Sequence, residues 1–257
     1  MRFKILISLV IVMLFVSFTA NAALNMKDKT CLLYLSCNEL NNNKGLTDSS
    51  SNKSDGTIVG TVNLVDGKFG KALQFAEAGE VKCPYIPLNN KSFTVCLWMN
   101  PKLAGGAEQC VFSQTDVNAT NTSMHFRMYN TGVVRMGFYS NDLDAPANSI
   151  KSNEWAHICY LVDVAGKTRK IYVNGVQVAK DAGVVGVEYL GKKGDTMVGS
   201  WGATGQKFNG MIDEVQVWDK ALSEAEIKDS MANLSATSAT SVGSADKLTS
   251  TWGSIKY

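Results

Sequence analysis

The segment from Phe208 to Ile227 constrains the fold most, because it places a strand pattern directly before a helix start. Side chains alternate with the period of two that is typical of a strand. One parity holds Met211, Asp213, Val215 and Val217, and the other holds Ile212, Glu214, Gln216 and Trp218. Ser223 and Glu226 then form a capping box, which predicts a helix with an apolar stripe of Ala221, Leu222, Ala225 and Ile227.

Residues 30 to 218 contain short strand patterns separated by turn residues, with only four prolines in the whole chain and no long helical period. Asn174-Gly175 is a strong hairpin signal, because both residues tolerate the positive φ of a type I′ turn. Regularly spaced short strands of this kind predict a β-sandwich.

Seven stretches resemble laminin-G-like domains of the bacterial type, in the order of that family. They are LLYLSCNEL, TDSSSNKSDGTIVG, GKFGKALQF, SFTVCLWMNP, NEWAHICYLVD, KIYVNGVQVA and the segment from Phe208, and they cover nearly all of residues 30 to 231. The resemblance implies an all-β, concanavalin A-like jellyroll of two antiparallel sheets with a short C-terminal α-helix. We expect this laminin-G-like domain to span residues 23–232.

The first 22 residues predict a signal peptide. Arg2 and Lys4 precede an apolar run from Ile5 to Phe18, and Ala20-Asn21-Ala22 has the form that signal peptidase cuts. The apolar run is shorter than the roughly 20 residues that span a bilayer, although an uncleaved anchor is the alternative. We therefore expect an exported protein, periplasmic, secreted or at the cell surface, with no transmembrane segment after cleavage.

The end of the chain changes to Ser, Ala and Thr, which predicts a flexible linker over residues 233–246. Residues 247–257 resemble short tails of some environmental bacterial laminin-G-like proteins. That resemblance implies sorting or docking to another envelope protein, and a frayed terminus is the alternative.

Net charge argues against nucleic acid as a partner. The chain has 25 Lys+Arg and 23 Asp+Glu, and loss of Arg2 and Lys4 with the signal peptide leaves 23 of each. Nucleic-acid binding depends on clustered positive charge, whereas the lysines here are interspersed with carboxylates.

All six cysteines follow the predicted cleavage site, in a segment where disulfides can persist. The strands around Cys96 and Cys159 resemble the disulfide-linked strands of pentraxins, which implies that these two cysteines pair. Two buried free thiols are the alternative. The other four cysteines allow three further pairings, which the sequence leaves open: Cys31, Cys37, Cys83 and Cys110.

A hairpin is predicted between Met124 and Tyr139, with a three-residue loop that ends at Gly132. In this register one face is wholly apolar, and the other places Arg127 opposite Arg135. Two opposed arginines repel, so a carboxylate from a neighbouring strand or an anionic ligand should compensate. Jellyrolls often bind saccharides on an open sheet face, which makes Arg127, Tyr129, Arg135 and Tyr139 the candidate ligand contacts.

A structural calcium site is a further expectation from the resemblance. Related sandwiches hold Ca²⁺ between the loop after the first strand and the last strand, which here corresponds to Glu39 or Asp48 and to Asp213. Carboxylates and loop carbonyls are the oxygen ligands that Ca²⁺ takes. The segment around Asp48 has equally the composition of an ordinary surface loop.

The sequence gives little support to catalysis. It has no Glu-x-Asp-x-x-Glu motif, no Gly-x-Ser-x-Gly elbow and no His-Glu-x-x-His motif. The leading hypothesis is therefore an exported module that binds carbohydrate or a glycoconjugate. A protein-interaction or envelope-structural module without sugar binding is the alternative, and a glycoside hydrolase of unfamiliar type is the third.

Overall fold

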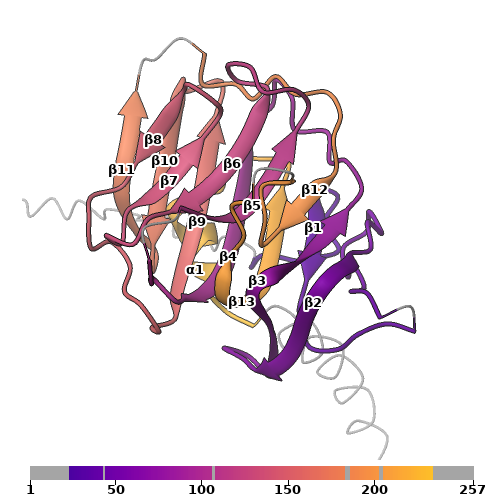
Figure 1. Ribbon diagram of the computed structural model, residues 1–257. Coiled ribbons are helices and arrows are strands. Elements are labelled where there is room, and N and C mark those ends of the chain that lie inside the picture. The colour runs from indigo at the N-terminus through magenta and orange to yellow at the C-terminus, as the bar shows by residue number, and fades with distance from the viewer. Residues whose placement is uncertain (1–22, 43, 106–107, 183–185, 203–204, 234–257) are drawn as a thin grey trace, which may run out of the picture.

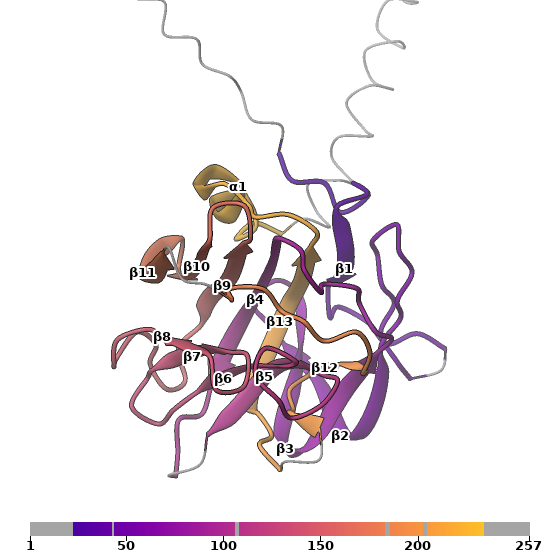
Figure 2. The same ribbon diagram turned by 90° about the horizontal axis from the view of Figure 1, so that it is seen from above.

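The computed structural model describes residues 23–42, 44–105, 108–182, 186–202 and 205–233 (Figure 1). The predicted signal peptide, the tail and all of the predicted linker except Asn233 lie outside these ranges. Within them the chain forms antiparallel strands in two stacked layers, which are seen edge-on in Figure 2. The all-β jellyroll sandwich predicted above is confirmed.

The back layer in Figure 1 is a sheet of long strands. In spatial order it contains β11 (Val176–Ala182), β10 (Thr168–Val173), β9 (Ala156–Asp163), β4 (Phe93–Pro101) and β13 (Asn209–Trp218), with β1 (Cys31–Leu35) paired to the end of β13. Asn174 and Gly175 between β10 and β11 have φ values of 50° and 77°, as the predicted hairpin turn requires.

The front layer lies on the other side of the core from this sheet. It contains β3 (Lys71–Cys83), β12 (Thr196–Val198), β5 (Gln109–Thr115), β6 (Ser123–Met128), β7 (Val134–Gly137) and β8 (Asp142–Asp144), and β2 (Thr57–Asp66) pairs with β3.

Strand β3 belongs to both layers, so the two predicted sheets are hydrogen-bonded into one continuous, folded sheet. Its residues 73–76 pair with β13 in the back layer, and residues 81–83 pair with β12 in the front layer. The change of direction falls near Glu77, whose φ of 59° is left-handed. Such a left-handed residue bends a strand out of its first sheet.

The main core fills the space between the layers. Phe126 of β6 stacks on Tyr160 of β9 with ring centroids 4.2 Å apart, and neither side chain is exposed to solvent. Burial of the Phe126 side chain contributes about 1.5–3 kcal/mol. The front layer is therefore held rigidly by its inner face, which leaves its outer face available to carry other groups.

Strand β13 departs from the alternation predicted for it. Its pairing with β4 shifts register between Asp213 and Gln216, and Glu214 has a φ of 53°. This β-bulge turns Ile212 into the same core as Val215, whereas strict alternation places the two on opposite faces. The predicted parity is correct only after the bulge, where Val217 and Trp218 contribute to different cores.

Helix α1 (Glu224–Asp229) covers the outside of the back layer (Figure 2). The predicted capping box is confirmed, since Ser223 and Glu226 exchange hydrogen bonds between side chain and backbone. Leu222 and Ile227 pack with Trp218 in a second, smaller core beneath the helix. The helix thus occupies the outer face of the back layer and leaves that of the front layer open.

Candidate functional site

The hairpin of β6 and β7 has the predicted register, which fixes what its two faces carry. Arg127 lies opposite Arg135 and His125 opposite Gly137, and Gly132 in the loop has a φ of 74°. The inner face is wholly apolar and fully buried: Met124, Phe126, Met128, Val134 and Met136. The outer face of the front layer therefore receives every polar side chain of the hairpin.

Three carboxylates compensate the opposed arginines on this outer face. Arg127 forms an ion pair with Glu108 and lies 3.7 Å from Asp142. Arg135 donates two hydrogen bonds of 2.7 Å to Asp144 and lies 3.0 Å from Asp142. The hydrogen bond to Asp144 is the main reason that the pKa of Arg135 is raised. Of the two compensations considered from the sequence, the structure contains the carboxylates of neighbouring segments.

Aromatic rings accompany these ion pairs. Trp201 lies with its ring centroid 4.2 Å from that of His125 and 5.2 Å from the guanidinium carbon of Arg127. Tyr139 packs edge-on against Trp201 at 6.4 Å, and the guanidinium of Arg135 lies 5.0 Å from the ring of Tyr129. Cation–π contacts of this kind fix both partners.

The four ligand contacts predicted from the sequence differ in accessibility. Arg127 is buried at 7% exposure beneath Trp201, which is itself 9% exposed. Arg135, Tyr129 and Tyr139 are half-buried. Burial raises the pKa of Tyr129 to about 12, so its hydroxyl stays protonated and can donate a hydrogen bond. The accessible part of the predicted set is therefore Tyr129, Arg135 and Tyr139.

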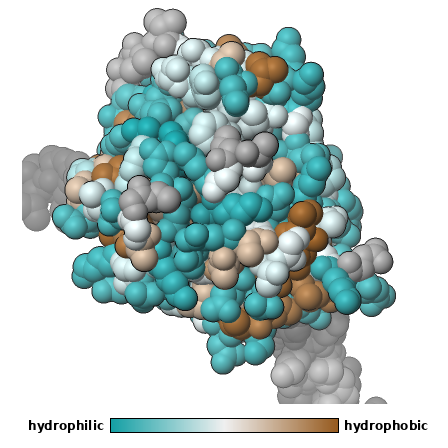
Figure 3. Space-filling model, in the orientation of Figure 1, coloured by the Kyte–Doolittle hydropathy of each residue, from teal (hydrophilic) through white to brown (hydrophobic). Residues whose placement is uncertain are grey.

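A groove of about 240 Å³ continues this surface over β5 and β12. It is lined by Ser113, Thr115, Gly194, Asp195, Met197 and Gly202. Thr115 connects the groove to the aromatic cluster, because its hydroxyl accepts the indole N–H of Trp201 at 3.0 Å. We call this groove, together with the neighbouring charged and aromatic side chains, the front-face site. These side chains are Glu108, His125, Arg127, Tyr129, Arg135, Tyr139, Asp142, Asp144 and Trp201. Hydrophilic residues dominate this side of the molecule in Figure 3.

Three buried polar atoms at or beside the front-face site have no hydrogen-bond partner: Nδ1 of His125, Nε of Arg127 and Oγ of Ser200, the residue before Trp201. Burial, with a further contribution from the charge of Arg127, lowers the pKa of His125 to about 3. The imidazole is therefore neutral at physiological pH. Unpartnered buried polar atoms are uncommon, so their concentration in one place distinguishes this face.

The three residues predicted to hold calcium are not brought together as a ligand set. Asp48 is fully buried, and its two carboxylate oxygens accept four hydrogen bonds of 2.7–2.9 Å, from Tyr34, Ser54 and two donors of Ser50. Glu39 is exposed. Asp48 thus organises its own loop, and its oxygens are used for these hydrogen bonds rather than for binding a metal ion.

Asp213 fits a cation better, and the bulge places Glu214 beside it. Oδ2 of Asp213 accepts the backbone N–H groups of Lys68 and Phe69 at 3.0 Å, while its Oδ1 is buried without a partner. Glu214 accepts the hydroxyl of Tyr34 at 2.5 Å and also has one unpartnered oxygen, Oε1. Burial raises the pKa of Asp213 to about 6 and that of Glu214 to about 8.

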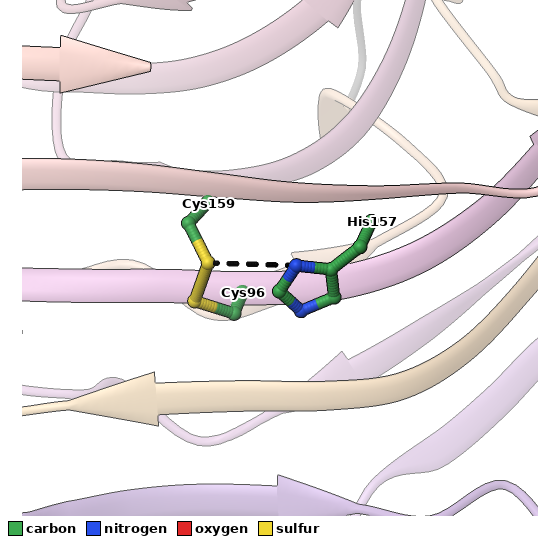
Figure 4. A group of neighbouring side chains, drawn as sticks. All are labelled: Cys96, His157 and Cys159. Atoms are coloured by element: carbon green, nitrogen blue, oxygen red, sulfur yellow. Dashed lines mark hydrogen bonds between the residues drawn. A yellow bond between two sulfur atoms is a disulfide. The ribbon is translucent and has the colours of Figure 1, made fainter. Parts of the chain in front are cut away.

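Cys96 and Cys159 form a disulfide between β4 and β9, the pair that the pentraxin resemblance implies. His157 lies beside it with Nδ1 3.9 Å from the sulfur of Cys159 (Figure 4). These are the only three His, Cys, Asp or Glu side chains in the described part of the chain whose donor atoms cluster closely enough for a metal. Because both sulfurs are in the disulfide, the cluster is a structural one under α1. The remaining cysteines are buried and free: Cys31, Cys37, Cys83 and Cys110.

Sequence comparison gives the family. A model described as the concanavalin A-like lectin/glucanases superfamily matches residues 75–228, more than half of the chain. The chain belongs to this superfamily. The neuronal pentraxin receptor of Rattus norvegicus is 26% identical over 145 residues, which cover 53% of this superfamily member and 28% of the receptor. The match thus spans little more than a quarter of that relative.

Solved structures share the fold of this superfamily member at low sequence identity. Domain 4 of the extracellular arabinanase AbnA from Geobacillus stearothermophilus, solved with arabinotriose, has a TM-score of 0.61 and 23% identity, covering 78% of this chain and 98% of that one. The binding domain of botulinum neurotoxin serotype C1 has a TM-score of 0.62 and 14% identity, covering 82% and 53%.

Sequence reasoning missed the residues that surround the predicted arginines. Trp201 follows β12 in a short loop, and Glu108 precedes β5, so neither belongs to a periodic pattern. Asp142 and Asp144 alternate within β8, which is only three residues long. The charge conflict between the arginines was the available signal that acids would lie nearby. Separately, none of the helices in the described ranges is long and apolar enough to cross a membrane.

Proposed function

We propose that this domain is an exported, non-catalytic module that binds carbohydrate or a glycoconjugate at the front-face site. The observation that carries the proposal is the combination of half-exposed Tyr129 and Tyr139, oriented charged groups and an adjoining groove on one sheet face. Small-ligand sites combine apolar rings with a few fixed polar groups in this way. The arabinanase domain solved with arabinotriose supports the proposal by analogy of fold.

A glycan array tests this proposal with purified residues 23–257. We expect selective binding that Tyr139→Ala weakens about tenfold or more, the loss of ~1.4 kcal/mol or greater that one stacking contact supplies. Phe69→Ala is the matched control, because Phe69 is a half-buried aromatic that packs against Trp98, outside the front-face site. Equal binding by wild type and Tyr139→Ala would reject the site, and an array without any binding would reject the function.

The distribution of acids supports a role without catalysis. A glycosidase needs a carboxyl group of raised pKa that can reach the substrate as a general acid. Burial raises the pKa of Asp213 and of Glu214, but both carboxyls are fully buried at the bulge of β13, out of reach of a substrate. Release of reducing sugar from any oligosaccharide bound on the array would favour the glycoside hydrolase hypothesis instead.

Strand β2 supports the second candidate, a protein-interaction module. In the part of the chain that the structure describes it pairs with β3 alone, and its apolar side chains are half-buried or exposed: Ile58, Val59, Val62, Leu64 and Val65. Hydrophobic residues gather at the lower right of Figure 3, where β2 lies in Figure 1. An open edge free of charge between residues 57 and 65 can pair with the same edge of a second copy. A dimer in light scattering that Val59→Lys converts to monomer would favour this function, and a monomeric wild type would count against it.

A structural calcium ion remains part of the proposal, with a different pair of ligands from that expected from the sequence. We place it at Asp213, with Glu214 in place of Asp48, because each of these two acids keeps one buried oxygen without a partner. Ca²⁺ takes six to eight oxygens, so two carboxylates would supply a minority of its shell.

Export of the protein and docking of residues 247–257 to another envelope protein also stay predictions. Fractionation of cells that carry the full-length or the truncated protein would test both.

A further inference from the structure

We propose that the front-face site is built for a neutral glycan and rejects sialylated or uronic-acid ligands. The inference rests on the proposed function and adds the chemical class of the ligand. Its basis is that the arginines of the site already carry acids of the same chain. An acidic sugar would have to compete with those acids, whereas a neutral sugar would use them.

Charge at the centre of the site is negative rather than positive. Two guanidinium groups, of Arg127 and Arg135, lie among three carboxylates, of Glu108, Asp142 and Asp144. The sum, two positive and three negative charges, is −1. Asp142 is shared, because it approaches both arginines. An anionic ligand therefore meets a surface of its own sign.

The guanidinium groups of both arginines are also already engaged within the protein, by burial and by hydrogen bonds. Arg127 is 7% exposed beneath Trp201, and its Nη1 contacts both Glu108 and Gln206. Arg135 uses its Nε and Nη2 in a two-point contact with Asp144. Recognition of an anion by arginine normally uses such a two-point contact. Arg135 therefore cannot offer this two-point contact to a ligand while Asp144 occupies it.

The groove end of the site is balanced in the same way. Asp195 lines the groove and pairs with Lys82 at 2.6 Å, which neutralises both. On the adjoining loop Lys193 lies 3.7 Å from Asp116, whose other oxygen accepts the backbone N–H of Lys192. These exposed lysines lie at the rim, where ordinary salt screens a charge.

A neutral glycan suits these groups because sugar hydroxyls both donate and accept hydrogen bonds. The carboxylates of Asp142, Asp144 and Asp195 remain partly exposed and can accept hydroxyl protons while they stay paired. The half-exposed rings of Tyr129 and Tyr139 supply apolar faces for sugar C–H groups. The ion pairs thus orient acceptors rather than offer an anion site.

Matched oligosaccharide pairs test the inference: lactose with 3′-sialyllactose, and α-1,4-galactotriose with trigalacturonate, extended by the same pairing of any further array hit. Wild type should bind a neutral member about tenfold or more tightly than its acidic counterpart, a difference of ~1.4 kcal/mol or greater. Neutral binding should change little when NaCl rises from about 0.05 to 0.5 M, because no net charge is neutralised.

The variant Asp142→Asn with Asp144→Asn reverses the central charge from −1 to +1 and should shift the preference toward the acidic member by about tenfold. Asp66→Asn is the control, because it neutralises an exposed carboxylate paired with Lys71 outside the site. Preference of wild type for acidic glycans would overturn the inference but leave the proposed function intact. An unchanged preference in the double variant would also overturn it, whereas no binding to any sugar would refute the proposed function itself.

Discussion

Ionisation of Glu214 should make the domain less stable as pH rises toward about 8. The carboxyl is fully buried, accepts the hydroxyl of Tyr34 at 2.5 Å and has Asp213 as its neighbour. Burial raises its pKa from 4.5 to about 8. Because the folded state holds this proton more tightly than the unfolded state, the stabilisation is complete below the unfolded pKa. It is lost as pH rises through about 8.

The best window for the measurement lies between about pH 6.5 and 8. His125 and His157 have pKa values lowered to about 3 by burial, so below about pH 6.5 they make stability rise with pH and mask the carboxyl. Above about pH 8 the free buried thiols, whose pKa is also raised, begin to contribute. Within the window a group with a pKa of about 8 releases its proton only from the folded state. Integration over the window gives a fall of about 1.5 kcal/mol.

Urea unfolding in chelator at several pH values between these limits measures the effect. Glu214→Gln removes the titration, so its stability should fall about 1.5 kcal/mol less than that of wild type across the window. Glu224→Gln, an exposed glutamate of α1, is the matched control and should follow wild type. Parallel profiles for wild type and Glu214→Gln would refute the reasoning. Millimolar Ca²⁺ should reverse the wild-type slope if it binds the ionised pair, and an unchanged slope would remove calcium from Asp213.

Three further variants test the fold that supports the site. Alanine at both Cys96 and Cys159 should lower the unfolding free energy by about 4 kcal/mol, since the disulfide closes a separation of 63 residues; an unchanged urea midpoint would contradict this. Ser223→Ala should cost about 1 kcal/mol through loss of the capping box, whereas Glu226→Gln, which can still accept, should cost less. Phe126→Ala should cost about 3–5 kcal/mol in the same assay, and a loss under about 1 kcal/mol would show that the layers pack loosely there.

The hairpin of β6 and β7 was predictable because its information is local. Alternation set the two faces, and the loop glycine set the register, so the opposition of Arg127 and Arg135 followed from the sequence. The family motifs predicted the jellyroll for the same reason, since each occupies one strand or turn. Glu108 and Trp201 come from neighbouring segments, and the sequence did not identify them. It predicted only that some negative group would lie near the arginines.

The bulge in β13 escaped prediction for a different physical reason. A left-handed residue in a strand is usually glycine or asparagine, but Glu214 occupies this position with a φ of 53°. Nothing in a run of alternating residues reveals that one of them is inserted. The consequence is that Asp213 and Glu214 are both buried, although strict alternation would place their side chains on opposite faces of the strand.

The two acidic clusters of this domain behave differently because of their partners. At the front-face site each carboxylate has an arginine or a lysine within 4 Å, so the acids there are paired and oriented before any ligand arrives. A ligand that keeps these pairs intact loses little conformational freedom in the protein, which favours affinity. At the bulge, no ion pair in the described part of the chain brings a cation to Asp213 or Glu214, and burial favours their protonated forms. Added cations should therefore affect the stability of the domain through the bulge, while sugar selectivity should depend on the paired acids of the front-face site.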